Sequence, residues 1–204
     1  MKRLLLAALV FSAPVAAFAE SYEIDSAHSN VGFAVKHLGV STVRGHFSKY
    51  SGTVDINDKD HSKDKVNVTI DSTSISTDNE KRDGHLKSPD FFDVAKYPTI
   101  TFVSKSVKGE GAGKAAVTGD LTMHGVTKEV VLQVTDLTPD MTSPMDKKAH
   151  RGASATATLN RQDFGVKWNA PLSGKAGDVA VSDEVKLAFD VELVAKDGAA
   201  PAKK

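Results

Sequence analysis

An aspartate, a histidine and a serine near the start of the chain are the first residues that could do chemistry. Asp25, His28 and Ser29 are the residue types of a catalytic triad. A triad needs each group to orient the next, and three residues within five positions at the start of a strand do not readily form that relay. The alternative role is local, with Asp25 or Ser26 turning the chain through a side-chain bond to the backbone. We therefore assign no catalytic residue and expect a binding protein, not an enzyme.

Three histidines could instead offer nitrogen ligands to a metal. His37 and His46 lie on two stretches joined by a short turn, and His28 precedes them. Their directions depend on strand register, because a shift of one residue exchanges the two faces of a strand. If Phe47 shares the inner face with Val35, His46 points to solvent, and the other register reverses both assignments. We expect polar or structural histidines and no metal site.

Two short segments imitate nucleotide-binding motifs. Residues 109–114, GEGAGK, lack the spacing and the following Ser or Thr of a phosphate-binding loop, so we expect a hairpin turn there. Residues 163–165 copy the Asp-Phe-Gly triplet of kinases, but nothing else of a kinase is present. We therefore expect no cofactor.

The elements that must position these residues are strands. Apolar and polar positions alternate through most of the chain, which is the period of a half-buried strand. The alternation covers residues 31–37, 66–71, 99–103, 126–135 and 184–193, and further strand patterns cover 43–56, 115–123 and 153–159. Short turn segments between them favour hairpin connections. The sequence therefore predicts an all-β fold of about eight antiparallel strands, as a sandwich or a closed barrel.

A helical excursion interrupts the strands. Thr77 and Glu80 form a Thr-x-x-Glu capping box, which predicts a polar helix that ends at Leu86. Phe91 and Phe92 follow it. Two adjacent rings point in different directions, so at least one can turn toward the barrel or cover one of its ends.

The second long connection, residues 161–183, contains the only tryptophan, Trp168, and has no clear period. Loops of this length in compact domains are often functional. Trp168 therefore has two interpretations: a ring that fills the core, or a ligand contact.

The strand pattern at residues 153–159 places no large side chain on either face before Leu159. Alanines at 153, 155 and 157 alternate with Ser154, Thr156 and Thr158. Either facing aromatic rings fill the space beside them, or an apolar cavity remains, which in a barrel of about eight strands fits one elongated lipid. The candidate rings are Phe33, Phe47, Phe102 and Phe189.

The first 19 residues have the pattern of a secretory signal peptide. Lys2 and Arg3 precede an apolar run, and Ala17-Phe18-Ala19 supplies the small-x-small cleavage pattern, so we expect cleavage after Ala19. The apolar run is shorter than the roughly 18 residues of a membrane span, and we expect no transmembrane segment in the mature chain. The expected organisation is a signal peptide at 1–19, one barrel domain at 20–195 and a disordered tail at 196–204.

Composition excludes several other classes of protein. The chain has no cysteine, which rules out disulfides, thiolate metal sites and a cysteine nucleophile. Lys and Arg number 26, as do Asp and Glu; without the two basic residues of the leader, 24 against 26 leaves a charge of −2. The charges are scattered singly, so we expect no nucleic-acid partner.

Four segments in order resemble the motifs of the YceI family. They are Asp25-x-x-His28-Ser29-x-Val31-x-Phe33-x-Val35-x-His37-Leu38-Gly39 with Val43-x-Gly45-x-Phe47, Leu86-Lys-Ser-Pro-Asp90-Phe91-Phe92-Asp93 before Tyr97-Pro98 and Phe102, Gly119-Asp-Leu121-Thr-Met-His-Gly125-Val126-Thr127-Lys128, and Arg161-x-Asp163-Phe164-Gly165. The resemblance implies a lipocalin-like antiparallel barrel, exported to the bacterial periplasm, whose interior accommodates a polyisoprenoid or another long apolar chain. It also implies a link to stress response or isoprenoid transport, and a homodimer.

The leading hypothesis is a periplasmic carrier that holds a polyisoprenoid or another long-chain lipid by apolar burial. Its ligand-binding residues would be Phe33, Val35, His37, Phe47, Phe91, Phe92, Phe102, Leu121, His124, Leu132 and Trp168. His37, His124 or Trp168 would lie near one end and contact the polar head of the lipid.

Two alternatives belong to other classes. A lipid-modifying enzyme would need Asp25, His28 and His37 to converge at the mouth of the barrel. A stress-induced interaction protein would have a filled barrel and would dock a partner through an exposed Phe91 or Trp168. A cavity in the barrel separates the carrier from the interaction protein.

Overall fold

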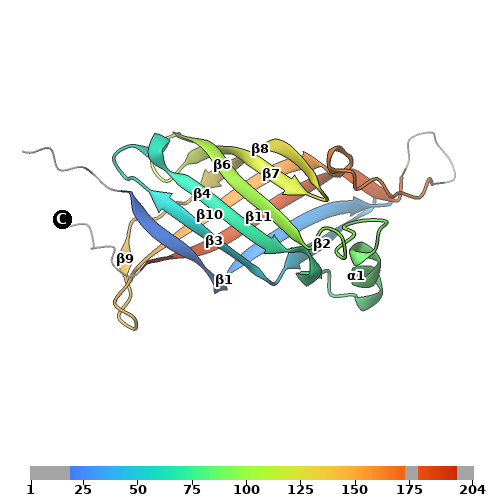
Figure 1. Ribbon diagram of the computed structural model, residues 1–204, viewed down its shortest axis with the longest axis horizontal. Helices are drawn as coiled ribbons and strands as arrows, with labels where there is room; N and C mark the ends of the chain where they lie inside the picture. The colour runs from blue at the N-terminus through green and yellow to red at the C-terminus, as the bar shows by residue number, and fades with distance from the viewer. Residues whose placement is uncertain (1–18, 173–178, 197–204) are drawn as a thin grey trace, which may run out of the picture.

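The computed structural model describes residues 19–172 and 179–196 (Figure 1). Its strands are β1 (Glu20–His37), β2 (Ser41–Phe47), β3 (Tyr50–Ile56), β4 (Lys65–Asp71), β5 (Ile75–Ser76), β6 (Thr99–Gly109), β7 (Ala115–Met123), β8 (Val126–Thr135), β9 (Met141–Thr142), β10 (Ala149–Asn160) and β11 (Val181–Ala195). Its helices are α1 (Glu80–Lys87) and the 3-10 turns η1 (His61–Lys63), η2 (Ser72–Ser74) and η3 (Arg161–Phe164). The predicted leader and tail fall almost wholly outside the described residues, so both stay predictions.

Eight of these strands close into an antiparallel barrel. Around the barrel the order is β1, β3, β4, β6, β7, β8, β10 and β11, and β11 pairs with β1 to complete the circle. The predicted fold class, an antiparallel barrel of about eight strands with a short helical excursion, is confirmed. The alternation of apolar and polar residues was also compatible with a sandwich. The pairing of the first strand with the last excludes that fold.

Strand β1 pairs with β3 through its first residues and with β2 through its last residues, on the same edge. Its inner-face partners in β2 are Phe47 opposite Val31, Gly45 opposite Phe33 and Val43 opposite Val35. Phe47 therefore shares the inner face with Val35, and His46 points outward. His37 has the inward parity of β1, so His37 and His46 lie on opposite faces and do not form a pair of metal ligands.

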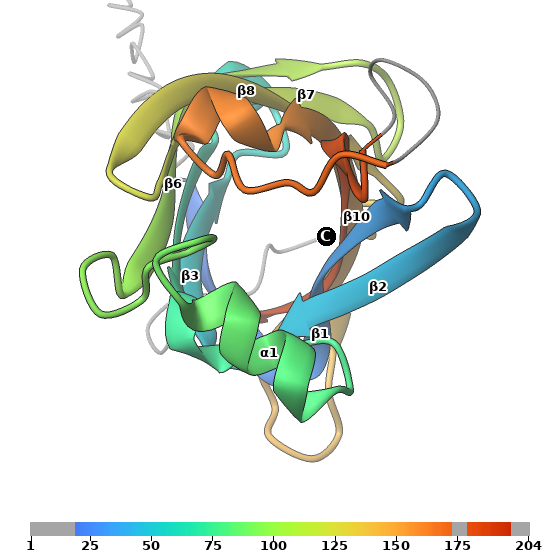
Figure 2. The same ribbon diagram turned by 90° about the vertical axis from the view of Figure 1, so that its right-hand side faces the viewer.

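Helix α1 lies across one end of the barrel (Figure 2). Asn79 caps it, because its side-chain oxygen accepts a hydrogen bond from the backbone N–H of Arg82. The predicted capping box is therefore wrong, although the helix is present. Thr77 instead turns toward Asp83, whose carboxylate accepts bonds from the backbone N–H of Thr77 at 2.8 Å and from its hydroxyl at 2.5 Å.

Buried apolar side chains form two groups inside the barrel. The larger group surrounds Phe47, Phe102 and Phe164, and the smaller surrounds Tyr22 and Leu193. In β7 every odd-numbered residue is buried and every even-numbered residue is half-buried, as expected of a strand with one side on the core. Across the described residues, no helix has the length and apolar character that a membrane span requires.

Candidate functional site

The barrel encloses two neighbouring cavities. The outer cavity, at the end covered by α1, has a volume of about 300 Å³, and the inner cavity, further along the barrel, has about 160 Å³. Both are lined by Val31, Ile70, Leu121, Leu187 and Phe189, so they meet end to end. Phe33 and Phe189 pack against the core and point into the barrel, yet they are only half-buried, because part of each ring faces this space. The interior is therefore not filled by its own rings.

Ten of the eleven residues proposed from sequence lie on the cavity walls. The outer cavity is lined by Phe33, Val35, His37, Phe47, Phe91, Phe92, Leu121 and Trp168, and the inner cavity by Phe102, Leu121 and Leu132. His124 lines neither cavity. It occupies the turn between β7 and β8 with a φ of 53°, and its ring packs on Tyr97 with centroids 4.7 Å apart.

Three rings form a lid over the outer cavity: His85 on α1, Phe91 after it, and Trp168 from the loop that follows η3. Their centroids lie 5.0 Å apart for His85 with Phe91, 5.0 Å for His85 with Trp168, and 5.1 Å for Phe91 with Trp168. Figure 2 shows α1 and the segment after η3 at the same end of the barrel. The lid thus joins two segments that lie far apart in the sequence.

The adjacent rings Phe91 and Phe92 point in different directions, as their spacing predicts. Phe91 turns to the lid, and Phe92 contacts Phe47 edge-on at 5.9 Å. Phe47 in turn lies 5.8 Å from Phe33. This row of rings leads from the lid into the lumen and gives the outer cavity an aromatic wall.

Arg161 holds the loop that carries Trp168. Its guanidinium is buried and donates hydrogen bonds to the carbonyl oxygens of Val166 at 2.7 Å and of Trp168 at 2.8 Å. Burial lowers the pKa of Arg161, and the ion pair with Asp183 at 3.0 Å opposes that shift. Sequence analysis assigned Arg161 only to a motif, because the carbonyls it binds become neighbours only when the loop has folded.

The polar side chains of the walls gather at the outer end. They are His37, Thr77, Arg82, His85 and Arg161 in the outer cavity, against Asp64 alone in the inner cavity. Arg82 is held by Thr77, with Nε 2.7 Å from its hydroxyl and a terminal nitrogen 2.7 Å from its carbonyl. Burial raises the pKa of Asp64, which favours the neutral form of that carboxyl group on an apolar wall.

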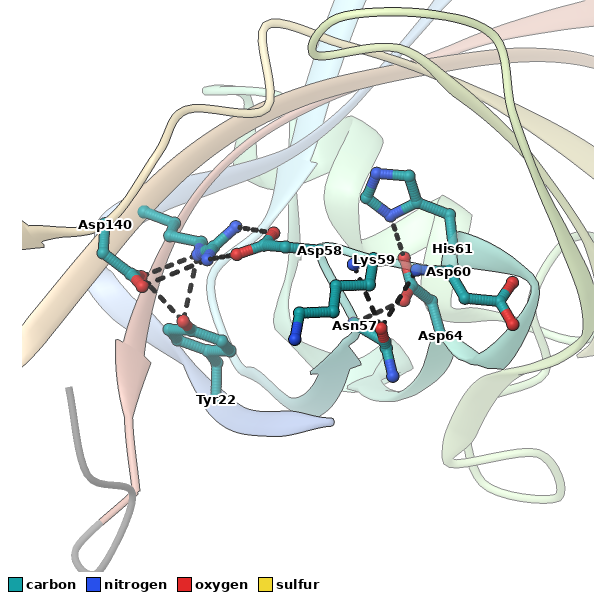
Figure 3. A network of polar contacts seen from close by, with 9 residues as sticks. Tyr22, Asn57, Asp58, Lys59, Asp60, His61, Asp64 and Asp140 are labelled. Atoms are coloured by element: carbon teal, nitrogen blue, oxygen red, sulfur yellow. Dashed lines mark hydrogen bonds and ion pairs between the residues drawn. The ribbon is translucent and has the colours of Figure 1, made fainter. Parts of the chain in front are cut away.

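A polar network lies at the opposite end of the barrel, and Figure 3 shows its contacts. The guanidinium of Arg151, only 4% exposed, donates two bonds to Asp58 at 2.8 and 2.7 Å and two to Asp140 at 2.7 and 3.1 Å. Tyr22 donates its hydroxyl proton to Asp140 at 2.7 Å and accepts from Arg151 at 2.9 Å. The barrel therefore has a lid of rings at one end and a buried network of ion pairs at the opposite end.

The enzyme alternative requires Asp25, His28 and His37 to converge, and the structure does not bring them together. His28 lies before Asn30, where the pairing of β1 becomes regular, and the seven steps from Asn30 to His37 alone span roughly 23 Å at a rise of about 3.3 Å per residue. His28 is exposed on the outer face, whereas His37 lines the outer cavity. Phe91, proposed as an exposed docking residue in the second alternative, is 6% exposed.

Comparison with known proteins identifies the family of this barrel. The family model for the YceI-like domain matches residues 22–193. The chain belongs to the YceI family. Protein YceI of Escherichia coli O157:H7 is 40% identical over 190 residues, which cover 90% of this chain and 97% of that protein. The crystal structure of a Campylobacter jejuni YCEI protein is 34% identical with a TM-score of 0.67, and covers 85% of this chain and 96% of that one.

A polyisoprenoid binding domain from Saccharophagus degradans, implicated in plant cell wall breakdown, shares the architecture. It is 18% identical with a TM-score of 0.58, and the match covers 88% of this chain and 99% of that domain. At that identity the likeness shows the fold alone.

The YceI motifs of this chain surround the outer cavity. The first motif supplies the second half of β1 and strand β2, the middle motif the end of α1 and the lid ring Phe91, and the last motif η3 with Arg161. The third motif supplies Leu121 and Met123, which line the outer cavity at the end of β7. All four segments that resemble the YceI family therefore contribute residues to the walls of this cavity, together with residues outside them such as Ile70, Leu187 and Phe189.

Proposed function

We propose that this protein is a periplasmic carrier that holds a polyisoprenoid or another long-chain amphiphilic lipid in its barrel. One observation carries the proposal: two apolar cavities meet end to end, and all of the charged and hydrogen-bonding side chains that the structure describes on their walls, except Asp64, line the outer one. A long chain with a polar head needs that arrangement. The polyisoprenoid binding domain with the same fold supports the choice of ligand class.

The apolar walls supply the affinity. Burial of one methylene group contributes about 0.8 kcal/mol, so a chain of moderate length binds strongly without a catalytic or metal centre. The ligand chain would run through the outer cavity into the inner one. Its head would lie at the outer end, near His37, Arg82 and His85. Most of the polar side chains line the outer cavity, whereas the inner cavity has only Asp64 among the described residues.

The periplasmic location rests on the predicted signal peptide, and the link to stress response and the homodimer rest on the resemblance to the YceI family. Cleavage after Ala19 would leave a mature chain that begins at Glu20, the first residue of β1. N-terminal sequencing of protein from a periplasmic extract tests the cleavage site. Light scattering during size-exclusion chromatography tests the dimer.

The ligand is tested by native mass spectrometry of protein purified gently from its own periplasm, followed by organic extraction and identification of the extract. We expect one lipid per chain with a long isoprenoid or acyl chain. Protein that has been unfolded, extracted and refolded should be empty and should take up isoprenoid alcohols, with affinity that rises with chain length. Protein that is isolated empty and also rejects these alcohols would contradict the proposal.

A further inference from the structure

The outer surface of the barrel carries a cluster of metal-ligating side chains, on the opposite face of the wall from the inner cavity. Asp25 and His28 on β1 and Glu192 on β11 each present one donor atom, and these atoms all lie within 4.8 Å of one another. Among the described residues, this is the one such group of three. It lies on the seam where the first strand of the barrel meets the last.

A large bulge in β1 builds the cluster. Asp25 lies opposite Glu192, but the next paired residue, Asn30, lies opposite Asp190, so β1 contains three more residues than β11 over this step. The extra residues fold His28 back until its Nδ1 lies 2.8 Å from a carboxylate oxygen of Asp25. The other oxygen of Asp25 accepts the backbone N–H of Ala27 at 2.8 Å, which fixes the turn. Bulges of this kind often re-aim a side chain at a functional position.

Glu192 is oriented by a second set of contacts. One of its carboxylate oxygens lies 2.7 Å from Nδ1 of His150, and Nε2 of His150 lies 3.0 Å from Asp146. Ligating carboxylates in metal sites are commonly held by such outer hydrogen bonds, which leave the second oxygen for the ion. The cluster thus has three candidate ligands and a supporting layer behind one of them.

The charges of the cluster favour a cation. Asp25 and Glu192 are direct cross-strand partners, and two like charges in that relation repel each other. Each carboxylate also holds a histidine nitrogen, with Nδ1 of His28 2.8 Å from Asp25 and Nδ1 of His150 2.7 Å from Glu192. The two carboxylates therefore draw positive charge to this point of the surface.

We propose that Asp25, His28 and Glu192 bind one divalent transition-metal ion, with water completing its coordination. One imidazole and two carboxylates suit ions such as Zn²⁺ that accept mixed nitrogen and oxygen ligands. Bond lengths of about 2.0–2.2 Å require donor atoms to lie roughly 3–4 Å apart, so the side chains need only small rotations. His28 is 67% exposed and Glu192 34% exposed, which leaves them free to make those rotations.

The bound ion would join β1 to β11 and so reinforce the closure of the barrel. This differs from the sequence expectation of no metal site, which considered His28 only together with His37 and His46. The ligands here come from two strands at opposite ends of the chain, and the bulge that brings His28 beside Asp25 has no periodic signal.

Calorimetric titration of the purified, untagged protein with Zn²⁺ tests the proposal. At about neutral pH we expect one ion per chain, and we expect His28→Gln and Glu192→Gln each to weaken binding about tenfold or more. His61→Gln is the matched control, because His61 forms the same i, i+3 pair with Asp64 at 2.9 Å but belongs to no such group of three. Circular dichroism checks that each variant is folded.

Binding should weaken as the pH falls through the pKa of His28, because the imidazole must lose its proton to ligate. The groups that face His28 are Asp25, Glu192 and His150, with Asp146 behind His150, and a bound cation would lower the pKa of the imidazole. Wild-type protein that binds no Zn²⁺, or a His28→Gln variant that binds as tightly as wild type, would overturn the proposal. Both outcomes are independent of whether a lipid occupies the barrel.

Discussion

Phe33 shows at the scale of one residue how a barrel lined with rings stays open. Its ring lies over Gly45 on the neighbouring strand, so close that a Cβ atom on Gly45 would lie 2.4 Å from its Cζ. Phe102 lies in the same way over Gly119, where a Cβ would be 2.5 Å from its Cζ. Because these rings lie against the wall over glycines, they leave the middle of the barrel free.

Gly45→Ala should therefore weaken lipid binding. The added methyl group displaces the ring of Phe33 into the outer cavity, and we expect affinity for a long isoprenoid alcohol to fall about tenfold, with a loss of stability of about 1–3 kcal/mol. The measurements are a fluorescence titration with the alcohol and urea unfolding. The double variant Gly45→Ala with Phe33→Leu should recover affinity, since the smaller side chain no longer needs the space.

Gly84→Ala is the matched control for that substitution. Nothing lies within 4 Å of a Cβ at Gly84, which is exposed on α1, so affinity should stay unchanged and the helix should gain slightly in stability. Equal affinity in Gly45→Ala and wild type would place the ligand outside the outer cavity.

Sequence reasoning found apolar and aromatic residues of the cavity walls but missed the two arginines. The period of two in β1, β6 and β7 was enough to select Phe33, Phe102 and Leu121, once one face was taken as inner. Arg82 and Arg161 were missed as wall residues, since their directions depend on backbone carbonyls that only the folded loops bring near. His124 was selected because it is polar and close to a strand end, but its turn directs the ring to Tyr97.

At the scale of elements, β10 decides how much of the interior remains open. Both sequence interpretations of its alanines hold in part: Ala155 lies opposite Phe189 in register, and Ala153 and Ala155 still line the inner cavity. The sequence could not separate a filled interior from an open one, because the direction of each facing ring depends on the register of strands far apart in the chain. The small side chains of β10 leave room that a ring on this strand would take.

Ala155→Phe should accordingly shorten the lipid that the protein can hold. The new ring enters the inner cavity of about 160 Å³, so the ligand chain can no longer pass beyond the outer cavity. We expect native mass spectra with shorter lipids, and a loss of the rise in affinity with chain length that wild type should show.

Ala188→Phe on β11 is the control for this substitution, because Ala188 is an exposed alanine of the neighbouring strand. It adds the same ring to the outside of the barrel and should leave the lipid length unchanged. If Ala155→Phe retains the wild-type lipids, the chain of the ligand does not reach the inner cavity.

At the scale of the whole molecule, the two ends of the barrel are held together by different kinds of interaction. The outer end has a lid of rings joined by weak aromatic contacts, and the opposite end has the Arg151 network. The network links β10 to the loop after β3 through Asp58, to the segment between β8 and β10 through Asp140, and to β1 through Tyr22. Ligand exchange should therefore occur at the outer end, while the opposite end stays fixed.

Arg151→Met should cost the protein stability rather than affinity. Methionine keeps an unbranched chain but leaves Asp140 and the buried hydroxyl of Tyr22 without their charged partner, and breaking such a pair costs about 3 kcal/mol or more. Urea unfolding measures this loss. Lys105→Met is the control, since Lys105 pairs with Asp120 and Glu129 on the exposed surface and its removal should change stability little.

The stability that Arg151 contributes to the folded state should decrease at low pH, because Asp58 then becomes protonated. The hydrogen bond from Arg151 lowers the pKa of Asp58 below its ordinary value, so the folded state gains stability above the unfolded pKa of about 3.9 and loses it as the pH falls through the lower, folded pKa. Wild-type stability should therefore fall between roughly pH 5 and pH 2 more steeply than that of Arg151→Met, and the gap between them should narrow. A gap that stays constant across this range would mean that Arg151 stabilises this end of the barrel through its contact with the ring of Tyr22, which lies 5.4 Å from the guanidinium, and not through its ion pairs with carboxylates.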